Sequence, residues 1–218
     1  MEAIQRHMIH NDWITVVLIL MGIAIAWLHM LYPKRLKALI ALVYNRFYLS
    51  DYEYSTGEML KRFNLTLMGV SVMILGLLAM VFLDVSDSSL PKYNFIIFLK
   101  SIGLILLYLV LKYIIENLLA SLFNIKPWYK LFAYVKRSYF LSFHLITLIL
   151  LVPALYYFKG DQAYVYILGA VYITLILMRY IQTINFFSAD LRAYLFYFIL
   201  YLCILEIAPL VLIYKWVI

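Results

Sequence analysis

Apolar residues in this chain gather into six long runs, which are separated by shorter stretches that contain charged residues. Runs near 20 residues, without the apolar-polar alternation of a membrane barrel strand, predict helices that cross a bilayer. The fifth run is the shortest and can extend toward Phe187. We therefore expect an all-α fold, a polytopic membrane protein with a bundle of about six transmembrane helices in one membrane domain, residues 1–218. The expected spans are 13–31, 65–83, 95–119, 139–158, 163–178 and 195–217.

The longest connection, residues 33–62, begins with an amphipathic pattern. Its first half reads PKRLKALIALVYNRF. One interpretation is a cytoplasmic interfacial helix whose lysines reach anionic headgroups. The other is a cytoplasmic extension of the first span that packs on protein. The apolar positions that share one side at helical spacing are Leu36, Leu39, Ile40, Val43 and Phe47.

Composition agrees with a membrane protein and changes the meaning of the net charge. The chain is 67% hydrophobic and 13% charged, about half the charge of an ordinary soluble domain. Its formal net charge is +7, but the basic residues cluster at the ends of the apolar runs. We therefore expect the lipid bilayer as a partner and no nucleic acid.

The basic residues also predict the direction of insertion, because positively charged connections face the cytoplasm. The connections between spans one and two, three and four, and five and six hold twelve of them, and the other side holds only four: Arg6, Lys92, Lys159 and Lys215. Both termini are therefore predicted on the outer, periplasmic side of the cytoplasmic membrane, and the opposite topology is the alternative. The twelve are Lys34, Arg35, Lys37, Arg46, Lys61, Arg62, Lys126, Lys130, Lys136, Arg137, Arg179 and Arg192.

Glu206 is an ionisable residue near the middle of the sixth run. A charged acid in the bilayer centre is costly, so Glu206 should face protein or a water-filled cavity. Pro209 has no backbone donor, which frees the carbonyl of Leu205 and favours a kink. Glu206 is then either a proton or ion relay or a ligand contact, or it is polar glue that is hydrogen-bonded to a neighbouring helix.

The third run contains three more charged residues, Lys100, Lys112 and Glu116. Lys112 and Glu116 are four residues apart and can meet on one helix face. One interpretation is an interfacial ion pair, with Lys100 snorkelling to the outer surface. The other is an intramembrane charge pair in which Lys112 reaches Glu206 or Glu116 across the bundle.

Small residues mark candidate helix-packing positions, because they let two backbones approach closely. Gly22 and Ala26 form a small-xxx-small pair in the first run, and Gly69 and Gly76 lie seven residues apart in the second. These positions are either internal contacts or a docking surface for another subunit.

The sequence contains no GxSxG, HExxH, glycine-rich phosphate loop or CxxC motif. His29 and His144 are isolated in the sequence, whereas a metal site needs three or four convergent ligands. We therefore expect no enzyme activity, no metal site and no cofactor.

Two stretches carry a family resemblance. The C-terminal LFYFILYLCILEIAPLVLIYK contains a Leu-Glu-Ile-x-Pro-like element at residues 205–209, and the N-terminal part contains HNDWITVVLIL. Both are similar to an uncharacterised multi-pass inner-membrane family of Bacteroidota, domain of unknown function 4271. The resemblance extends over nearly the whole chain and implies the inner membrane of a Gram-negative cell, but no known activity.

These observations leave three hypotheses for the function. The first is a non-enzymatic subunit or accessory factor of a larger inner-membrane assembly, in protein export or envelope biogenesis. The alternative is a small ion-coupled transporter or carrier that uses Glu206, with Lys112 as its partner. The third is an intramembrane enzyme that acts on lipid.

Overall fold

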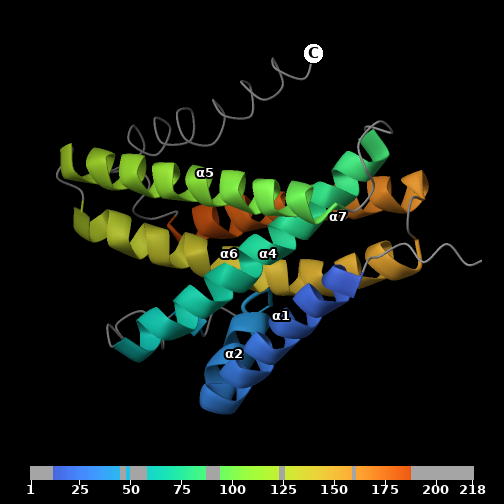
Figure 1. Cartoon of the computed structure of the whole chain (residues 1–218). Helices are drawn as coiled ribbons and strands as arrows, with labels where there is room; N and C mark the ends of the chain where they lie inside the picture. The colour runs from blue at the N-terminus through green and yellow to red at the C-terminus, as the bar shows by residue number, and fades with distance from the viewer. Residues whose placement is uncertain are drawn as a thin grey trace, which may run out of the picture.

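In the computed structural model the chain is helical, with no strand in the parts that the structure describes, which confirms the expected all-α fold. Those parts are residues 12–44, 48–49, 58–86, 94–122, 126–158 and 161–187. Their helices are α1 (Asp12–Leu31), α2 (Pro33–Ala41), α4 (Glu58–Ser86), α5 (Phe95–Leu122), α6 (Lys126–Tyr156) and α7 (Gln162–Phe186) (Figure 1).

Five of these helices are long and apolar enough to cross a membrane. They match the first five predicted runs, and the sixth predicted span, 195–217, lies outside the described residues. The chain is therefore a polytopic helical membrane protein. The segments that meet the length and composition of a span are Asp12–Leu31, Arg62–Leu83, Phe95–Leu122, Tyr129–Tyr156 and Gln162–Phe186.

Two of the helices extend beyond the fourth and fifth predicted spans. α6 begins at Lys126, well before the predicted start at 139, and α7 continues to Phe186, in line with the extension expected toward Phe187. The predictions stopped at Lys136, Arg137 and Arg179, because charged residues end an apolar run. The helices nevertheless continue through these residues, of which Lys136 and Arg179 are partly buried and Arg137 is exposed.

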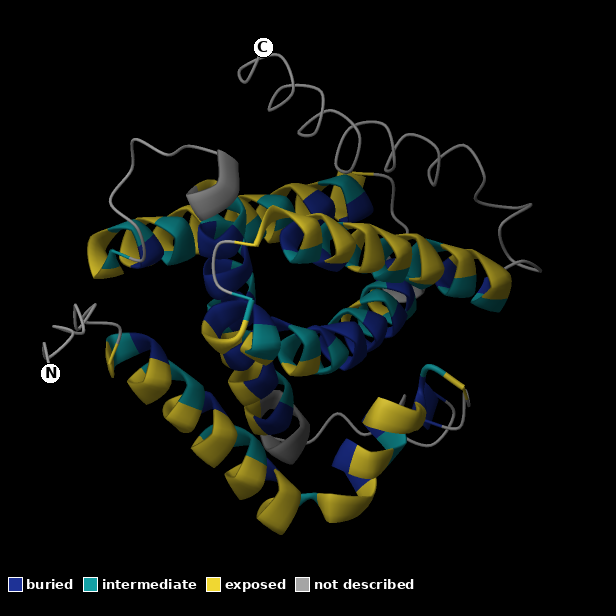
Figure 2. Cartoon of the chain, turned by 90° about the vertical axis from the view of Figure 1, so that its right-hand side faces the viewer, coloured by how far each residue is buried: buried dark blue, intermediate teal, exposed yellow. Residues whose placement is uncertain are grey.

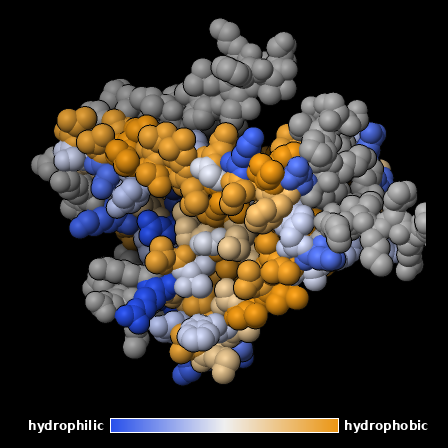
Figure 3. Space-filling model, viewed as in Figure 1, coloured by the Kyte–Doolittle hydropathy of each residue, from blue (hydrophilic) through white to orange (hydrophobic). Residues whose placement is uncertain are grey.

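Helices α4 to α7 run back and forth across the bundle (Figure 1). α4 and α6 finish, and α5 and α7 begin, at one end, called here the α4–α5 end (Figure 1). The other end, where α4 and α6 begin and α5 and α7 finish, is called here the α5–α6 end. α4 and α6 pack in the middle of the bundle. In the 18-residue apolar stretch of each helix, 56% of the residues are buried in α4 and 61% in α6, against 6% in α5 and 22% in α1. Figure 2 shows α1 largely in the exposed colour, and Figure 3 shows hydrophobic residues along α5.

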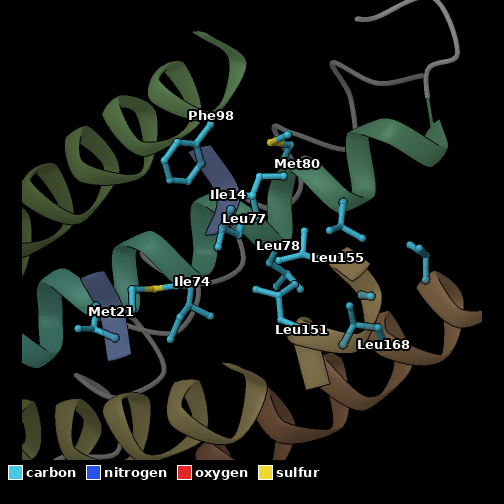
Figure 4. Packing of buried hydrophobic residues seen from close by; sticks show 14 residues of the cluster. Ile14, Met21, Ile74, Leu77, Leu78, Met80, Phe98, Leu151, Leu155 and Leu168 are labelled. Carbon is cyan, nitrogen blue, oxygen red and sulfur yellow. The ribbon is translucent and has the colours of Figure 1, made fainter. Parts of the chain in front are cut away.

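Buried apolar side chains form one cluster near each end of the bundle. The cluster at the α4–α5 end draws on five helices, and Phe98 is the member from α5 (Figure 4). The cluster at the α5–α6 end contains Leu36 and Leu39 of α2, Phe63 of α4 and Phe132 of α6. None of its described members comes from α5. At this end α5 is therefore held by other interactions.

α2 is a separate short helix that packs on protein. Tyr32 has an extended φ of −137° and Pro33 occupies the first turn, so the chain breaks from α1 and starts a new helix. Leu36 and Leu39 are buried, while Lys34 and Lys37 are exposed. The contact of these lysines with headgroups stays a prediction.

Arg35 of α2 is buried, although the sequence places it among the basic residues of the connection. Only 7% of its surface is exposed. Its guanidinium lies 4.5 Å from the centroid of the Phe63 ring. Nε and Nη2 both donate hydrogen bonds to Tyr48 Oη, at 3.3 Å and 3.2 Å. Aromatic contact and charge-assisted hydrogen bonds together offset the cost of burying this cation.

Gly76 is the point of close approach between α4 and α5. A Cβ atom there would lie 2.9 Å from Ile102 Cγ1 and 3.1 Å from Phe98 Cε2, so only glycine fits without movement of the neighbours. The other small residues singled out from the sequence are exposed, and at the two glycines no described neighbour lies within 4 Å of an added Cβ. Those residues are Gly22, Ala26 and Gly69.

Candidate functional site

A cavity of about 420 Å³ lies between α4, α5, α6 and α7 at the α5–α6 end of the bundle. Its wall is mostly apolar and aromatic, but it also contains charged side chains inside segments that are apolar enough to span a membrane. Charged residues at such positions are rare and usually mark a functional pathway. The ionisable side chains other than tyrosine are Lys112, Glu116, Lys136, Arg137, His144 and Arg179.

Each helix presents one face to the cavity. On α5, Tyr108, Lys112 and Glu116 are spaced four residues apart, and on α7, Tyr172 and Arg179 are seven apart. These separations bring side chains to one side of a helix. The face of α6 follows the same periodicity, with Tyr129, Ala133, Lys136, Phe140, Phe143 and His144.

The Glu116 carboxylate is the polar centre of the wall. Lys136 Nζ donates to Glu116 Oε1 at 2.6 Å, and Tyr129 Oη donates to Glu116 Oε2 at 2.8 Å. Glu116 is only 6% exposed, and the other buried residues of α5 are Phe98 and Ala120. An ion pair thus joins α5 to α6 at the end where α5 adds nothing to the described apolar cluster.

Lys112, the partner expected from spacing, lies in the same wall one turn before Glu116. It adds a favourable electrostatic interaction with the Glu116 carboxylate. Its ammonium also lies 5.8 Å from the centroid of the Tyr108 ring. Glu116 also accepts hydrogen bonds from Lys136 and Tyr129, which both come from the next helix.

His144 lines the cavity, links α6 to α7 and is 4% exposed. Its Nδ1 lies 2.6 Å from the Phe140 carbonyl oxygen, which can only accept, so Nδ1 carries the proton. Nε2 is then free to accept a long hydrogen bond from Tyr172 Oη, at 3.4 Å. Within the described ranges no group of three His, Cys, Asp or Glu residues could hold a metal ion.

Arg179 brings a guanidinium from α7 to the cavity. Its Cζ lies 5.0 Å from the centroid of Tyr180 and 5.6 Å from that of Phe140. Aromatic faces attract a guanidinium and shield it from lipid. The wall therefore draws its cations from three helices.

Only part of this site could be predicted from the sequence. Lys112 and Glu116 were expected as functional candidates, whereas Lys136, Arg137 and Arg179 were assigned to connections. The helical spacing of these basic residues with the tyrosines was the signal that could have found them. Glu206 and Pro209 lie outside the described residues, and His29 is exposed near the end of α1.

The chain matches the sequence model of a protein family. The sequence model of the domain of unknown function DUF4271 matches residues 14–217, which is nearly the whole chain. Neither a curated protein nor a solved structure gives a match to the chain. The matched region includes residues 205–209, which carried the resemblance seen in the sequence. The chain belongs to the DUF4271 family.

Proposed function

We propose that the chain is a small, non-enzymatic carrier of the inner membrane, which binds its substrate in the cavity at the α5–α6 end. The observation that carries this proposal is the cluster of charged side chains around a cavity inside spanning helices. Binding cavities for small molecules have volumes of about 300–1,000 Å³ and mostly apolar walls with a few polar groups. The 420 Å³ cavity falls in this range.

The distribution of basic residues predicts on which side of the membrane the proposed site lies. Basic residues near the starts of α2, α4 and α6, among them Lys34, Arg62 and Lys130, lie toward the α5–α6 end, and the positive-inside rule favours the cytoplasm for that end. The cavity would then lie in the cytoplasmic half of the bilayer. Substrate would be loaded from, or delivered to, that side.

Ligand screening followed by a flux assay tests the carrier proposal. Compounds that raise the unfolding temperature of the purified protein are offered to proteoliposomes that contain it. We expect uptake by the wild type, and loss of uptake in Lys112→Gln and Glu206→Gln without loss of expression. Lys100→Gln is the matched control, because Lys100 lies on α5 outside the cavity wall. Stabilising ligands that never cross the membrane would count against a carrier.

A second candidate function is a subunit of a larger inner-membrane assembly. It is favoured by the exposure of Gly22 and Ala26 on α1, since small residues on an uncovered face suit close contact with another helix. We expect stoichiometric partners after purification in mild detergent, and loss of those partners in Gly22→Leu. A pure monomer would contradict this function.

A further inference from the structure

The charge of the cavity wall narrows the chemistry of its ligand. Among the described lining residues, Lys112, Lys136, Arg137 and Arg179 are cationic and Glu116 is the one carboxylate, which gives a formal charge of +3 without His144. If one more carboxylate, from outside the described residues, lined the cavity, the formal charge would still be positive. A wall of this kind, inside apolar helices, favours a ligand with negative charge.

The cations approach the cavity from different helices. Lys112 comes from α5, Lys136 and Arg137 come from α6, and Arg179 comes from α7. Guanidinium groups bind carboxylate and phosphate through two parallel N–H donors, and an ammonium adds a compact charge. Cations from three helices thus line the cavity that an anionic group would enter.

The rest of the wall is suited to an apolar chain. Met68 and Leu75 of α4, Ile105 and Leu109 of α5, and Leu175 of α7 face the same cavity as the cations. A free inorganic anion would leave these side chains without a partner, whereas an acyl or alkyl chain would be buried against them. The wall of the cavity thus contains both charged and apolar side chains.

We infer that the cavity binds an amphiphile with an anionic headgroup, a phosphate or a carboxylate attached to an apolar chain. The inference rests on the proposed function only in taking this cavity as the binding site. It does not depend on transport.

Thermal unfolding of the full-length protein in a neutral detergent tests the inference. The probes are dodecyl phosphate, dodecyltrimethylammonium with the same chain, and inorganic phosphate. We expect dodecyl phosphate to raise the unfolding temperature by about 5–10 °C when it is present at roughly 100 times its Kd. The cationic probe should give little or no shift. An equal shift with both amphiphiles would overturn the inference, and a full shift with inorganic phosphate would show that no chain is needed and contradict the amphiphile.

Single substitutions test whether the shift in unfolding temperature comes from binding in this cavity. Lys112→Gln and Arg179→Gln should lose most of the shift with dodecyl phosphate, and Arg179→Lys should keep part of it because the charge remains. Lys100→Gln on the same helix, outside the wall, should keep the full shift. An equal loss in Lys100→Gln would assign the effect to general surface charge and overturn the site. For each variant, the unfolding temperature with the probe is compared with the unfolding temperature without it. Differences in stability between the variants therefore do not affect the shift.

Failure of the inference differs from failure of the proposed function. A charge-selective shift without uptake of dodecyl phosphate into proteoliposomes would reject the carrier and leave the binding site standing. Uptake of a neutral or cationic compound that is lost in Lys112→Gln would support the carrier and reject an anionic ligand.

Discussion

The Glu116 carboxylate of α5 and the Lys136 ammonium of α6 lie 2.6 Å apart and join two helices at the end where α5 shares no residue of the described apolar cluster. Removing one partner of a buried pair typically costs about 3–5 kcal/mol. We expect Glu116→Gln and Lys136→Gln each to lower the free energy of unfolding by about 3 kcal/mol, since Gln keeps some hydrogen bonding. Denaturant unfolding in mixed micelles measures both changes.

The double variant Glu116→Gln/Lys136→Gln tests whether the two side chains stabilise the fold as a pair. If Glu116 and Lys136 act on one another, the double variant should lose less than the two single losses added together, by about 1–3 kcal/mol. Additive losses would mean that the two side chains do not stabilise the fold as a pair. Lys100→Gln serves as the control for removing a lysine from α5.

Gly76→Ala tests the close contact between α4 and α5. The added Cβ would meet Ile102 at 2.9 Å and Phe98 at 3.1 Å, so these side chains must move. Overpacking of this kind costs about 1–3 kcal/mol. Gly69→Ala and Gly103→Ala are matched controls, because no described neighbour lies within 4 Å there. We expect a lower unfolding temperature for Gly76→Ala alone, and equal values for all three would contradict the contact.

Arg35→Lys tests whether the guanidinium itself is needed in its aromatic site. Lysine keeps the charge but lacks the planar group that lies over Phe63 and donates twice to Tyr48. We expect a loss of about 1–2 kcal/mol in unfolding free energy. Lys37→Gln on the exposed side of α2 should change it by less than about 0.5 kcal/mol. If Arg35 served only to contact headgroups, Arg35→Lys would have no effect.

Cysteine labelling tests the predicted topology. In a Cys203→Ala background, Ser88→Cys lies in a predicted outer connection and Ser55→Cys in a predicted cytoplasmic one. A membrane-impermeant maleimide should label Ser88→Cys in cells whose inner membrane is intact, and Ser55→Cys only after permeabilisation. The reverse pattern would mean that both termini face the cytoplasm.

The helices could be predicted from the sequence because length and apolarity are local properties. Residues 95–119 are apolar enough to identify α5, and the observed helix differs by a few residues at one end. The charged site could be predicted only in part. Spacing within a helix brings Lys112 close to Glu116, but it says nothing about Lys136, which follows Glu116 by 20 residues and reaches it only because α5 and α6 pack together. Contacts between helices depend on that packing and not on any local pattern.

The buried residues of α5 differ in chemistry between the two ends of the helix. Phe98 is buried near one end and Glu116, with Ala120, near the other, about 27 Å away at 1.5 Å per residue. The first contact is apolar, whereas the second includes the ion pair between Glu116 and Lys136. Loss of the ion pair would therefore weaken the attachment of α5 at one end of the bundle and leave the apolar contact of Phe98 at the other end intact.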